Sequence, residues 1–312
     1  MWFERGLQPE QEPLIAGLAT PTGPDVGDLA TARAAIAGVG YQWDDDFYAT
    51  TAPNLTVVVR SGIGFDVLDL DAATRHNVMA CNTPEGPTVS TAEHTVALLL
   101  SAAKLLPVVQ QRLRQGDGNY VPVNGGVELD GLTAGIVGFG RIGSRVGRTL
   151  SALGMNVLVN DPFIEDDQIP PSMERVSFED VLQRSEVVTL HLPLEPSTRQ
   201  FMGAAEFAAM KPGSIFVNAA RGGLVDHDAL VAAIDSGRLH SAALDVTEPE
   251  PLAADHPLLQ RDNVIVTPHI AAATVAGKNR MYDMAVTAAL QALRGEEPAN
   301  LLNPAVLDTA SE

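Results

Sequence analysis

The segment TAGIVGFGRIG, residues 133–143, indicates the fold class most clearly. Its first half, TAGIVGF, is a short apolar run typical of a buried strand, and a helix is predicted from Arg141 onward. Gly138, Gly140 and Gly143 have the spacing of a dinucleotide-binding turn. The first glycine permits a tight bend, the second lets the backbone approach a pyrophosphate, and the third lets helix and strand pack closely. The start of the helix would face the phosphates with free N–H groups. Because glycine-rich turns are common, the motif needs a second feature downstream to indicate a nucleotide site.

Asp161 supplies that second feature. It follows the predicted strand NVLVN and lies eighteen residues beyond Gly143. A carboxylate there can accept both ribose hydroxyls of an adenosine and would repel the 2′-phosphate of NADP. Pro162 and Phe163 come next, with no arginine to bind such a phosphate, so the sequence favours NAD over NADP as the cofactor. The alternative is an aspartate that only starts a turn before Pro162.

Strand and helix patterns alternate on both sides of this motif, which predicts an α/β fold with doubly wound parallel sheets. Downstream, the predicted strands are 186–192, 214–220, 239–245 and 263–269, and the predicted helices are 177–184, 204–210 and 226–237. Upstream, after a loose arm at 1–13, the predicted strands are 13–19, 54–60 and 78–82, and the predicted helices are 28–38, 69–77 and 89–115. Residues 116–126 form a turn-rich connection, and a last helix over 273–294 ends at Gly295, a typical C-cap residue.

Length and charge limit the possible functions. A chain of 312 residues suggests about two domains, each with its own core. The net charge of −19 disfavours nucleic acid and anionic membranes as partners, and an anionic substrate would need a local cationic pocket. The single cysteine, Cys81, and the lack of a signal-peptide pattern predict a cytoplasmic protein.

Three side chains suited to acid chemistry follow predicted strands. Arg221 lies in NAARGG, Glu250 in DVTEPEP and His269 in TPHIA. In a doubly wound sheet the carboxyl ends of the strands form the ligand-binding edge. Arginine can hold both oxygens of a carboxylate, and histidine can take or supply the proton of a hydroxyl while a carboxylate fixes its tautomer. Each residue alone could be a surface charge or a turn residue, but together they predict a catalytic group. The other histidines are expected at the surface or an interface, except His191, which is expected to line the cofactor.

The chain resembles the D-isomer-specific 2-hydroxyacid dehydrogenases, a family that includes phosphoglycerate dehydrogenases and glyoxylate/hydroxypyruvate reductases. The resemblance rests on six segments in the family's order: VELDGLTAGIVGFGRIG, NDP at Asp161, VTLHLPLEPSTR, VNAARGGLVD, AALDVTEPEP and TPHIA. It implies a Rossmann-type NAD-binding domain, residues 93–274, and a discontinuous flavodoxin-like substrate domain, residues 1–92 and 275–312. It also implies a homodimer, and hydride transfer between NAD(H) and C2 of a small D-2-hydroxy or 2-oxo acid.

The resemblance also implies roles for individual residues, with no metal site. The catalytic residues would be Arg221, Glu250 and His269. Asp245 would bind the nicotinamide carboxamide. The full set of expected cofactor contacts is Gly138, Gly140, Arg141, Ile142, Gly143, Asp161, Leu192, Thr198, Ala219, Ala220, Asp245, His269, Ala272, Thr83 and Thr95. The expected substrate contacts are Arg60, Ser61, Gly62, Ile63, Gly64 and Arg221, with the backbone N–H groups of Ser61 to Gly64 on the substrate carboxylate.

Departures from relatives narrow the substrate class. Glu250 stands where formate-oxidising relatives have Gln, and Ile63 where phosphite-oxidising relatives have Lys, which argues against both substrates. The end of the chain at Glu312 indicates that the regulatory domain of many phosphoglycerate dehydrogenases is absent, and the short stretch before Asn54 indicates a missing or altered element. Arg60 and Arg75 resemble positions that meet a phosphate, or they make surface ion pairs. Hydroxypyruvate, glyoxylate and 3-phosphoglycerate are the candidate substrate class. A branched 2-oxo acid reductase and an NAD(H)-sensing corepressor-like protein are the alternatives.

Overall fold

The computed structural model describes residues 1–119 and 124–309, so part of the predicted connection at 116–126 lies outside the described residues. The chain forms two compact units. Unit 1 comprises Met1–Thr88 and Ala273–Glu312, and unit 2 comprises Val89–Ala272. The sequence placed the two domain boundaries after residues 92 and 274, which is four and two residues beyond the boundaries in the structure.

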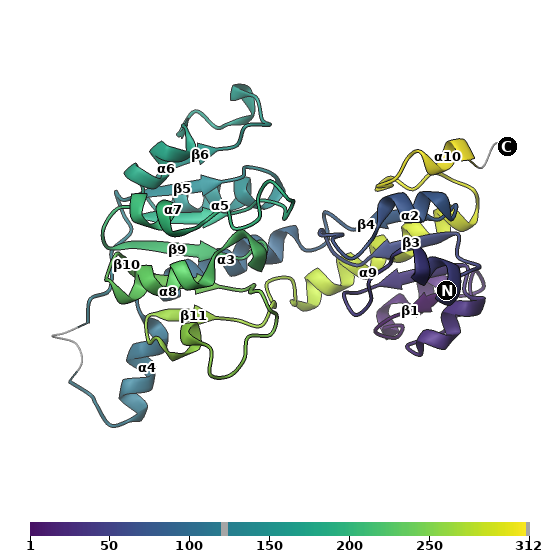
Figure 1. The fold of residues 1–312 in the computed structure, drawn as a ribbon, viewed down its shortest axis with the longest axis horizontal. Coiled ribbons are helices and arrows are strands. Elements are labelled where there is room, and N and C mark those ends of the chain that lie inside the picture. The colour runs from purple at the N-terminus through teal and green to yellow at the C-terminus, as the bar shows by residue number, and fades with distance from the viewer. Residues whose placement is uncertain (120–123, 310–312) are drawn as a thin grey trace. The chain divides into compact units, whose positions relative to one another are not determined.

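Unit 2 is built on a seven-stranded parallel sheet with the order β11-β10-β9-β8-β5-β6-β7 (Figure 1). The chain order reverses between β5 and β8, which is the switch point of a Rossmann-type sheet and confirms the predicted fold. The strands are β5 (Thr133–Val137), β6 (Asn156–Asn160), β7 (Met173–Arg175), β8 (Val187–Leu190), β9 (Ser214–Asn218), β10 (Leu239–Leu244) and β11 (Val264–Val266).

Helices cover both faces of this sheet because successive strand residues point to opposite sides. In β9, Ile215 packs into one apolar cluster with α3 and α5, whereas Phe216 packs into a second cluster with α6, α7 and α8. The helices are α3 (Thr88–Ala103), α4 (Leu106–Arg114), α5 (Arg141–Ala152), α6 (Phe178–Arg184), α7 (Ala204–Ala209) and α8 (His227–Asp235), with 3-10 turns at Asp166–Gln168, Gly222–Leu224 and Pro257–Gln260.

The single long helix expected over 89–115 is instead two helices. Leu105 has φ +52°, and Pro107 lies in the first turn of α4, where its missing N–H costs nothing. The axes of α3 and α4 bend by 58° at this break. No single helix among residues 1–119 and 124–309 is long and apolar enough to cross a membrane, although α3 and α4 together pass that test.

Unit 1 has a parallel sheet of β1 (Trp2–Phe3), β2 (Ala34–Ala37), β3 (Val57–Arg60) and β4 (Met79–Asn82), in that order. Trp2 pairs with Ala35 on one side and with Thr22 on the other. The N–H of Phe3 donates to the Thr22 carbonyl at 3.0 Å, so Thr22 acts as a one-residue strand beyond β1. If Thr22 is counted and the strands are numbered in chain order, their order across the sheet is 2-1-3-4-5, which is the flavodoxin-like order. The altered element expected before Asn54 is therefore this second strand, which Pro21 and Pro24 shorten because proline lacks a backbone donor.

Three sequence predictions for unit 1 are wrong. The expected loose arm contains β1, whose Trp2 and Phe3 are fully buried. The strand expected at 13–19 is a short helix, α1 (Glu12–Ile15), and the helix expected at 28–38 is a 3-10 segment (Val26–Thr31) followed by β2. The AAIA run of β2 is buried between β1 and β3, so strand pairing overrides the helical preference of alanine.

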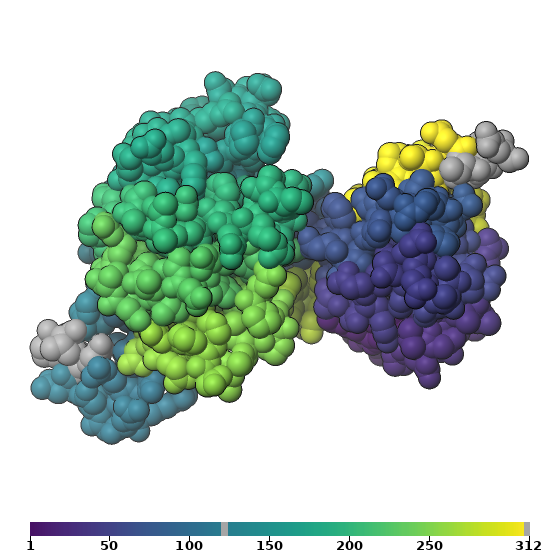
Figure 2. Space-filling model, viewed as in Figure 1, coloured from purple at the N-terminus to yellow at the C-terminus, as the bar shows by residue number. Residues whose placement is uncertain are grey.

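The remaining helices close unit 1. They are α2 (Leu70–Arg75), α9 (Val275–Leu293) and α10 (Val306–Thr309), with a 3-10 turn at Pro9–Gln11 and a π-helical segment at Phe47–Thr51. Gly295 follows α9 with φ +75°, as expected of a residue just past a helix end. The yellow C-terminal segment lies beside α2 (Figures 1 and 2), where Asn303 donates to the Thr74 hydroxyl at 3.0 Å. Its side-chain oxygen also accepts from the N–H of Ala80 at 2.8 Å, which ties this segment to β4.

Candidate active site

The glycine-rich turn between β5 and α5 has the shape of a phosphate cradle. Gly138 has φ +89°, and a Cβ there would lie 2.6 Å from the His191 carbonyl oxygen. A Cβ on Gly143 would overlap the Gly138 carbonyl oxygen, so only glycine lets α5 pack this closely on β5. Gly140 is different: in the described part of the chain, nothing beyond its neighbours lies within 4 Å of the place its Cβ would take. It is also the N-cap of α5 and supplies no side-chain cap, so the turn fits a pyrophosphate.

The carboxylate of Asp161 lies against this cradle. Its Oδ2 accepts from the N–H of Phe139 at 2.8 Å, and its Oδ1 accepts from the N–H of Phe163 at 2.9 Å. The second bond is the turn expected by the alternative interpretation, while the first links the carboxylate to the glycine-rich loop. Each oxygen retains capacity for a further donor, as ribose hydroxyls would require.

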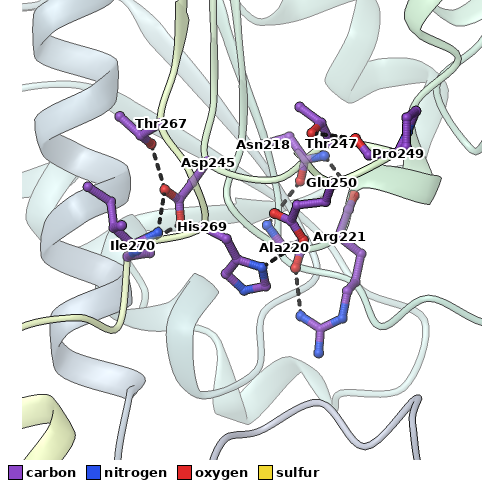
Figure 3. Close-up of polar contacts among 11 residues, drawn as sticks. Asn218, Ala220, Arg221, Asp245, Thr247, Pro249, Glu250, Thr267, His269 and Ile270 are labelled. Carbon is purple, nitrogen blue, oxygen red and sulfur yellow. Dashed lines mark hydrogen bonds and ion pairs between the residues drawn. The ribbon is translucent and has the colours of Figure 1, made fainter. Parts of the chain in front are cut away.

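The three residues predicted to be catalytic gather at the carboxyl edge of the sheet (Figure 3). Arg221 follows β9, Glu250 lies in the loop after β10, and His269 follows β11. His269 Nδ1 and Glu250 Oε2 are 3.0 Å apart, so the carboxylate accepts the Nδ1 proton and leaves Nε2 for chemistry. Both side chains are partly exposed, at 43% and 38%, as access to a ligand requires.

Two residues that sequence reasoning missed shape the loops around this group. Asn218, the last residue of β9, donates from Nδ2 to the Arg221 carbonyl at 2.8 Å and accepts from the N–H of Ala220 at 3.0 Å. Thr247 donates to the Pro249 carbonyl at 2.9 Å, just before Glu250. Both are buried polar residues at strand ends, and that position beside predicted catalytic residues is the signal that could have found them.

Asp245 organises the loop that carries His269. It is fully buried, and its carboxylate accepts from the Thr267 hydroxyl at 2.5 Å and from the N–H groups of Ile270 and Ala271 at 3.0 and 2.8 Å. His94 Nε2 of α3 lies 3.3 Å from the same carboxylate, so His94, expected from the sequence at the surface or an interface, belongs to this network. Burial alone would raise the pKa of Asp245, but the donors from His94, Thr267 and the loop outweigh it and hold that pKa below its usual range.

Several side chains expected to contact the cofactor instead make hydrogen bonds within the protein. Thr83, Thr95 and Asp245 have no exposed surface, and their polar atoms bond inside the protein. The Thr83 hydroxyl accepts from Gly62, and the Thr95 hydroxyl donates to the Thr91 carbonyl. The Thr198 hydroxyl donates to the Pro193 carbonyl at 2.7 Å within its own loop. Of the remaining expected contacts, Arg141 and Ile142 begin α5, Leu192, Ala219 and Ala220 lie just after β8 and β9, and Ala272 lies six residues beyond β11.

The loop after β3 in unit 1 is held by the ends of β2 and β4. The N–H of Ser61 donates to the Ala37 carbonyl at 2.9 Å, and the N–H of Gly62 donates to the Thr83 hydroxyl at 2.8 Å. Asn82 donates to the Ile63 carbonyl at 2.7 Å. The N–H groups of Ser61 and Gly62 are therefore used within the protein. Of the four donors expected to face a carboxylate, those of Ile63 and Gly64 remain.

The two arginines considered for a phosphate are engaged locally. The Arg60 guanidinium donates to the Ser61 carbonyl of its own loop. Arg75 donates from Nε and Nη2 to Asp45 Oδ1, at 3.1 and 3.0 Å. For Arg75 the structure therefore shows the alternative, a surface ion pair.

Comparisons with known proteins agree with this geometry. Residues 96–271 match the family described as D-isomer specific 2-hydroxyacid dehydrogenase, NAD binding domain. The chain is 44% identical over 224 residues to a D-3-phosphoglycerate dehydrogenase of Archaeoglobus fulgidus, covering 72% of this chain and 42% of that protein. It is 39% identical over 263 residues to a glyoxylate reductase of Aeropyrum pernix, covering 82% and 78%. The chain thus spans about half the length of the phosphoglycerate dehydrogenases that it matches.

Solved structures extend the likeness to both units. The TT0316 protein of Thermus thermophilus superposes with a TM-score of 0.89 at 33% identity, covering 97% of this chain and all of that one. A D-lactate dehydrogenase of Aquifex aeolicus, solved with NAD and lactic acid, gives 0.86 at 27% identity, covering 97% and 98%. The matched domain model and the fit of the cradle identify NAD as the cofactor. By sequence, fold and site, the chain belongs to the D-isomer-specific 2-hydroxyacid dehydrogenases.

Proposed function

We propose that this protein is an NAD-dependent dehydrogenase that moves a hydride between NAD(H) and C2 of a small D-2-hydroxy or 2-oxo acid. The observation that carries the proposal is the His269–Glu250 pair, with 3.0 Å between Nδ1 and Oε2, at the sheet edge that also holds Arg221 and the glycine cradle. A proton-transfer group, a cation for a carboxylate and a nucleotide site are what this reaction requires.

Each residue has one role in the proposed reaction. The bound cofactor would supply the hydride acceptor as NAD and the hydride donor as NADH. His269 Nε2 takes the hydroxyl proton of the 2-hydroxy acid, or supplies it to the oxygen of the 2-oxo acid. Glu250 keeps the Nδ1 proton in place and stabilises the imidazolium that forms. The Arg221 guanidinium holds the substrate carboxylate as a planar fork.

Unit 1 carries its own pair of candidate donors for a carboxylate. The N–H groups of Ile63 and Gly64 make no hydrogen bond to the described residues, whereas those of Ser61 and Gly62 are used by Ala37 and Thr83. Consecutive backbone donors without a blocking side chain at Gly64 suit an anion. We propose that they bind a carboxylate group.

The ion pair between Arg75 and Asp45 favours substrates that are small acids without a second anionic group. Its guanidinium is occupied by Asp45, and the Aeropyrum relative covered over most of its length is a glyoxylate reductase. Within the candidate class we therefore favour glyoxylate and hydroxypyruvate over the phosphorylated acid.

The test is NADH oxidation with glyoxylate, hydroxypyruvate, phosphohydroxypyruvate and a branched 2-oxo acid. We expect turnover of the small acids, and little with His269→Ala. Arg221→Lys should mainly raise KM for the acid, because a point charge cannot replace a fork. NADH binding without turnover of any acid would instead favour the corepressor-like alternative. A preference for phosphohydroxypyruvate would contradict the assignment of small acids.

We further propose a homodimer that works in the cytoplasm. On α4, Leu106 and Leu113 are 51% and 67% exposed, and these apolar side chains suit contact with a second copy. The thiol of Cys81 is free and buried, and burial raises its pKa to about 12. A free thiol is compatible with a reducing compartment such as the cytoplasm. Light scattering of wild type and Leu113→Asp tests the dimer. A monomeric wild type would refute it.

A further inference from the structure

His94 is a polar residue at the carboxyl edge that the proposed reaction does not use. It lies in the second turn of α3 and is 22% exposed. Its Nε2 lies 3.2 Å from the Thr267 hydroxyl oxygen and 3.3 Å from Asp245 Oδ1. It thus reaches the network beneath His269 from a different element of unit 2.

The direction of these hydrogen bonds is fixed by the number of protons available. Asp245 is a carboxylate and only accepts. The single hydroxyl proton of Thr267 lies between its Oγ1 and Asp245 Oδ1, 2.5 Å apart. Both oxygens that face His94 Nε2 are therefore acceptors toward it, so Nε2 must carry the proton. His94 donates, and it is a side-chain donor to Asp245 from outside the 267–271 loop.

The loop that Asp245 holds has an unusual conformation. His269 has φ +51°, which non-glycine residues rarely adopt. Its N–H donates to the Asp245 carbonyl at 2.8 Å, while the Asp245 carboxylate binds the next two N–H groups. Such backbone persists only where its surroundings fix it. The orientation of the Asp245 carboxylate therefore sets where the His269 ring lies relative to Glu250.

We propose that His94 is a positioning residue for proton transfer: by donating to Asp245 and Thr267 it fixes the carboxylate that holds the His269 loop in its reactive conformation. The inference rests on the proposed function for its catalytic consequence, but its structural part does not need turnover. The two parts can be measured separately.

Hydrogen exchange of the Ile270 and Ala271 amides tests the structural part. In His94→Leu, which keeps much of the side-chain volume, these amides should exchange about tenfold faster than in wild type. His94→Gln can place an amide donor near the same point and should restore most of the protection. His240→Leu is the matched control. His240 is at the amino end of β10, and its Nε2 has no hydrogen-bond partner among the described residues.

Steady-state kinetics test the catalytic part. His94→Leu should lower kcat by about tenfold and leave KM for the 2-oxo acid near the wild-type value, because the loop places the proton donor and not the carboxylate fork. His94→Gln should recover most of kcat. A merely structural role would lower the melting temperature without this separation of kcat from KM.

Four other outcomes of these measurements would overturn the proposed role of His94. Unchanged exchange in His94→Leu, equal loss in His94→Gln, or equal loss in His240→Leu would overturn the proposal. Faster exchange with unchanged kcat would also overturn it, since positioning would then have no consequence. If wild type turns over no 2-oxo acid, the proposed function fails, and the exchange data alone decide whether His94 holds the loop.

Discussion

His269 and Glu250 are joined by a 3.0 Å hydrogen bond across nineteen residues of sequence, from two loops at the same sheet edge. Both side chains are more than a third exposed, and ion pairs of that kind contribute little to stability. The pair therefore matters for the state of the imidazole ring and not for folding. Replacing Glu250 with Gln should lower kcat by about a hundredfold, because the charge that stabilises the imidazolium is lost. The melting temperature should stay within about 2 °C of wild type.

Glu174→Gln is a suitable control for that measurement. Glu174 also makes an exposed ion pair, with Arg184, but on β7 at the far side of the sheet from β11. This variant should leave kcat unchanged. A Glu250→Gln enzyme as active as Glu174→Gln would remove Glu250 from the catalytic group.

Two glycines of the cradle, Gly140 and Gly143, separate NADH binding from folding stability. A methyl group on Gly140 meets open space, whereas one on Gly143 overlaps the Gly138 carbonyl oxygen. Gly140→Ala should therefore keep the wild-type melting temperature and weaken NADH binding by about tenfold or more, since the methyl occupies the approach to the pyrophosphate. Gly143→Ala should lower the free energy of unfolding by about 1–3 kcal/mol. Fluorescence titration and thermal unfolding of both variants check this, and a Gly140→Ala protein with normal NADH affinity would mean that the phosphates bind elsewhere.

The Asp161 carboxylate accepts a hydrogen bond from the glycine-rich loop, and its charge is expected to exclude the 2′-phosphate of NADPH. Two variants separate these functions. Asp161→Asn keeps a side-chain oxygen for the N–H of Phe139 but removes the charge. We expect it to reduce the preference for NADH over NADPH, measured as the ratio of kcat/KM values, while keeping the loop in place. Asp161→Ala should reduce the same preference and also destabilise the loop. Unchanged discrimination in both variants would show that Asp161 does not face the adenosine ribose.

The success of the sequence predictions follows from how local their causes are. The turn at Gly138–Gly143 and the strand ends at Arg221 and His269 are set by residues next to one another, and local pattern identified them. The strand at Ala34–Ala37 could not be predicted in this way. Its alanines favour a helix, and only pairing with β1 and β3 makes them a strand.

The polar network beneath the site shows the same limit. His94 and Asp245 are 151 positions apart, and nothing in the local pattern around His94 indicates a buried carboxylate beside it. Thr83 was expected at the cofactor from the family resemblance, yet its hydroxyl accepts from the N–H of Gly62. Which acceptor a buried donor finds depends on tertiary packing, so these contacts become visible only in three dimensions.

His191 gives a prediction about stability against pH. Burial beside the glycine-rich turn lowers the pKa of His191 from 6.5 to about 3. Between these values the unfolded chain binds a proton at this residue that the folded chain does not, so the free energy of unfolding must fall as the pH drops below about 6.5. His191→Gln cannot take up this proton, so the contribution disappears in the variant, while those of the other titrating groups cancel in the comparison. Between about pH 7.5 and about pH 5.5, wild type should lose about 1 kcal/mol more than the variant in urea unfolding. Equal losses would mean that the folded protein protonates His191 as readily as the unfolded chain does, and that the ring beside the cradle is not held neutral.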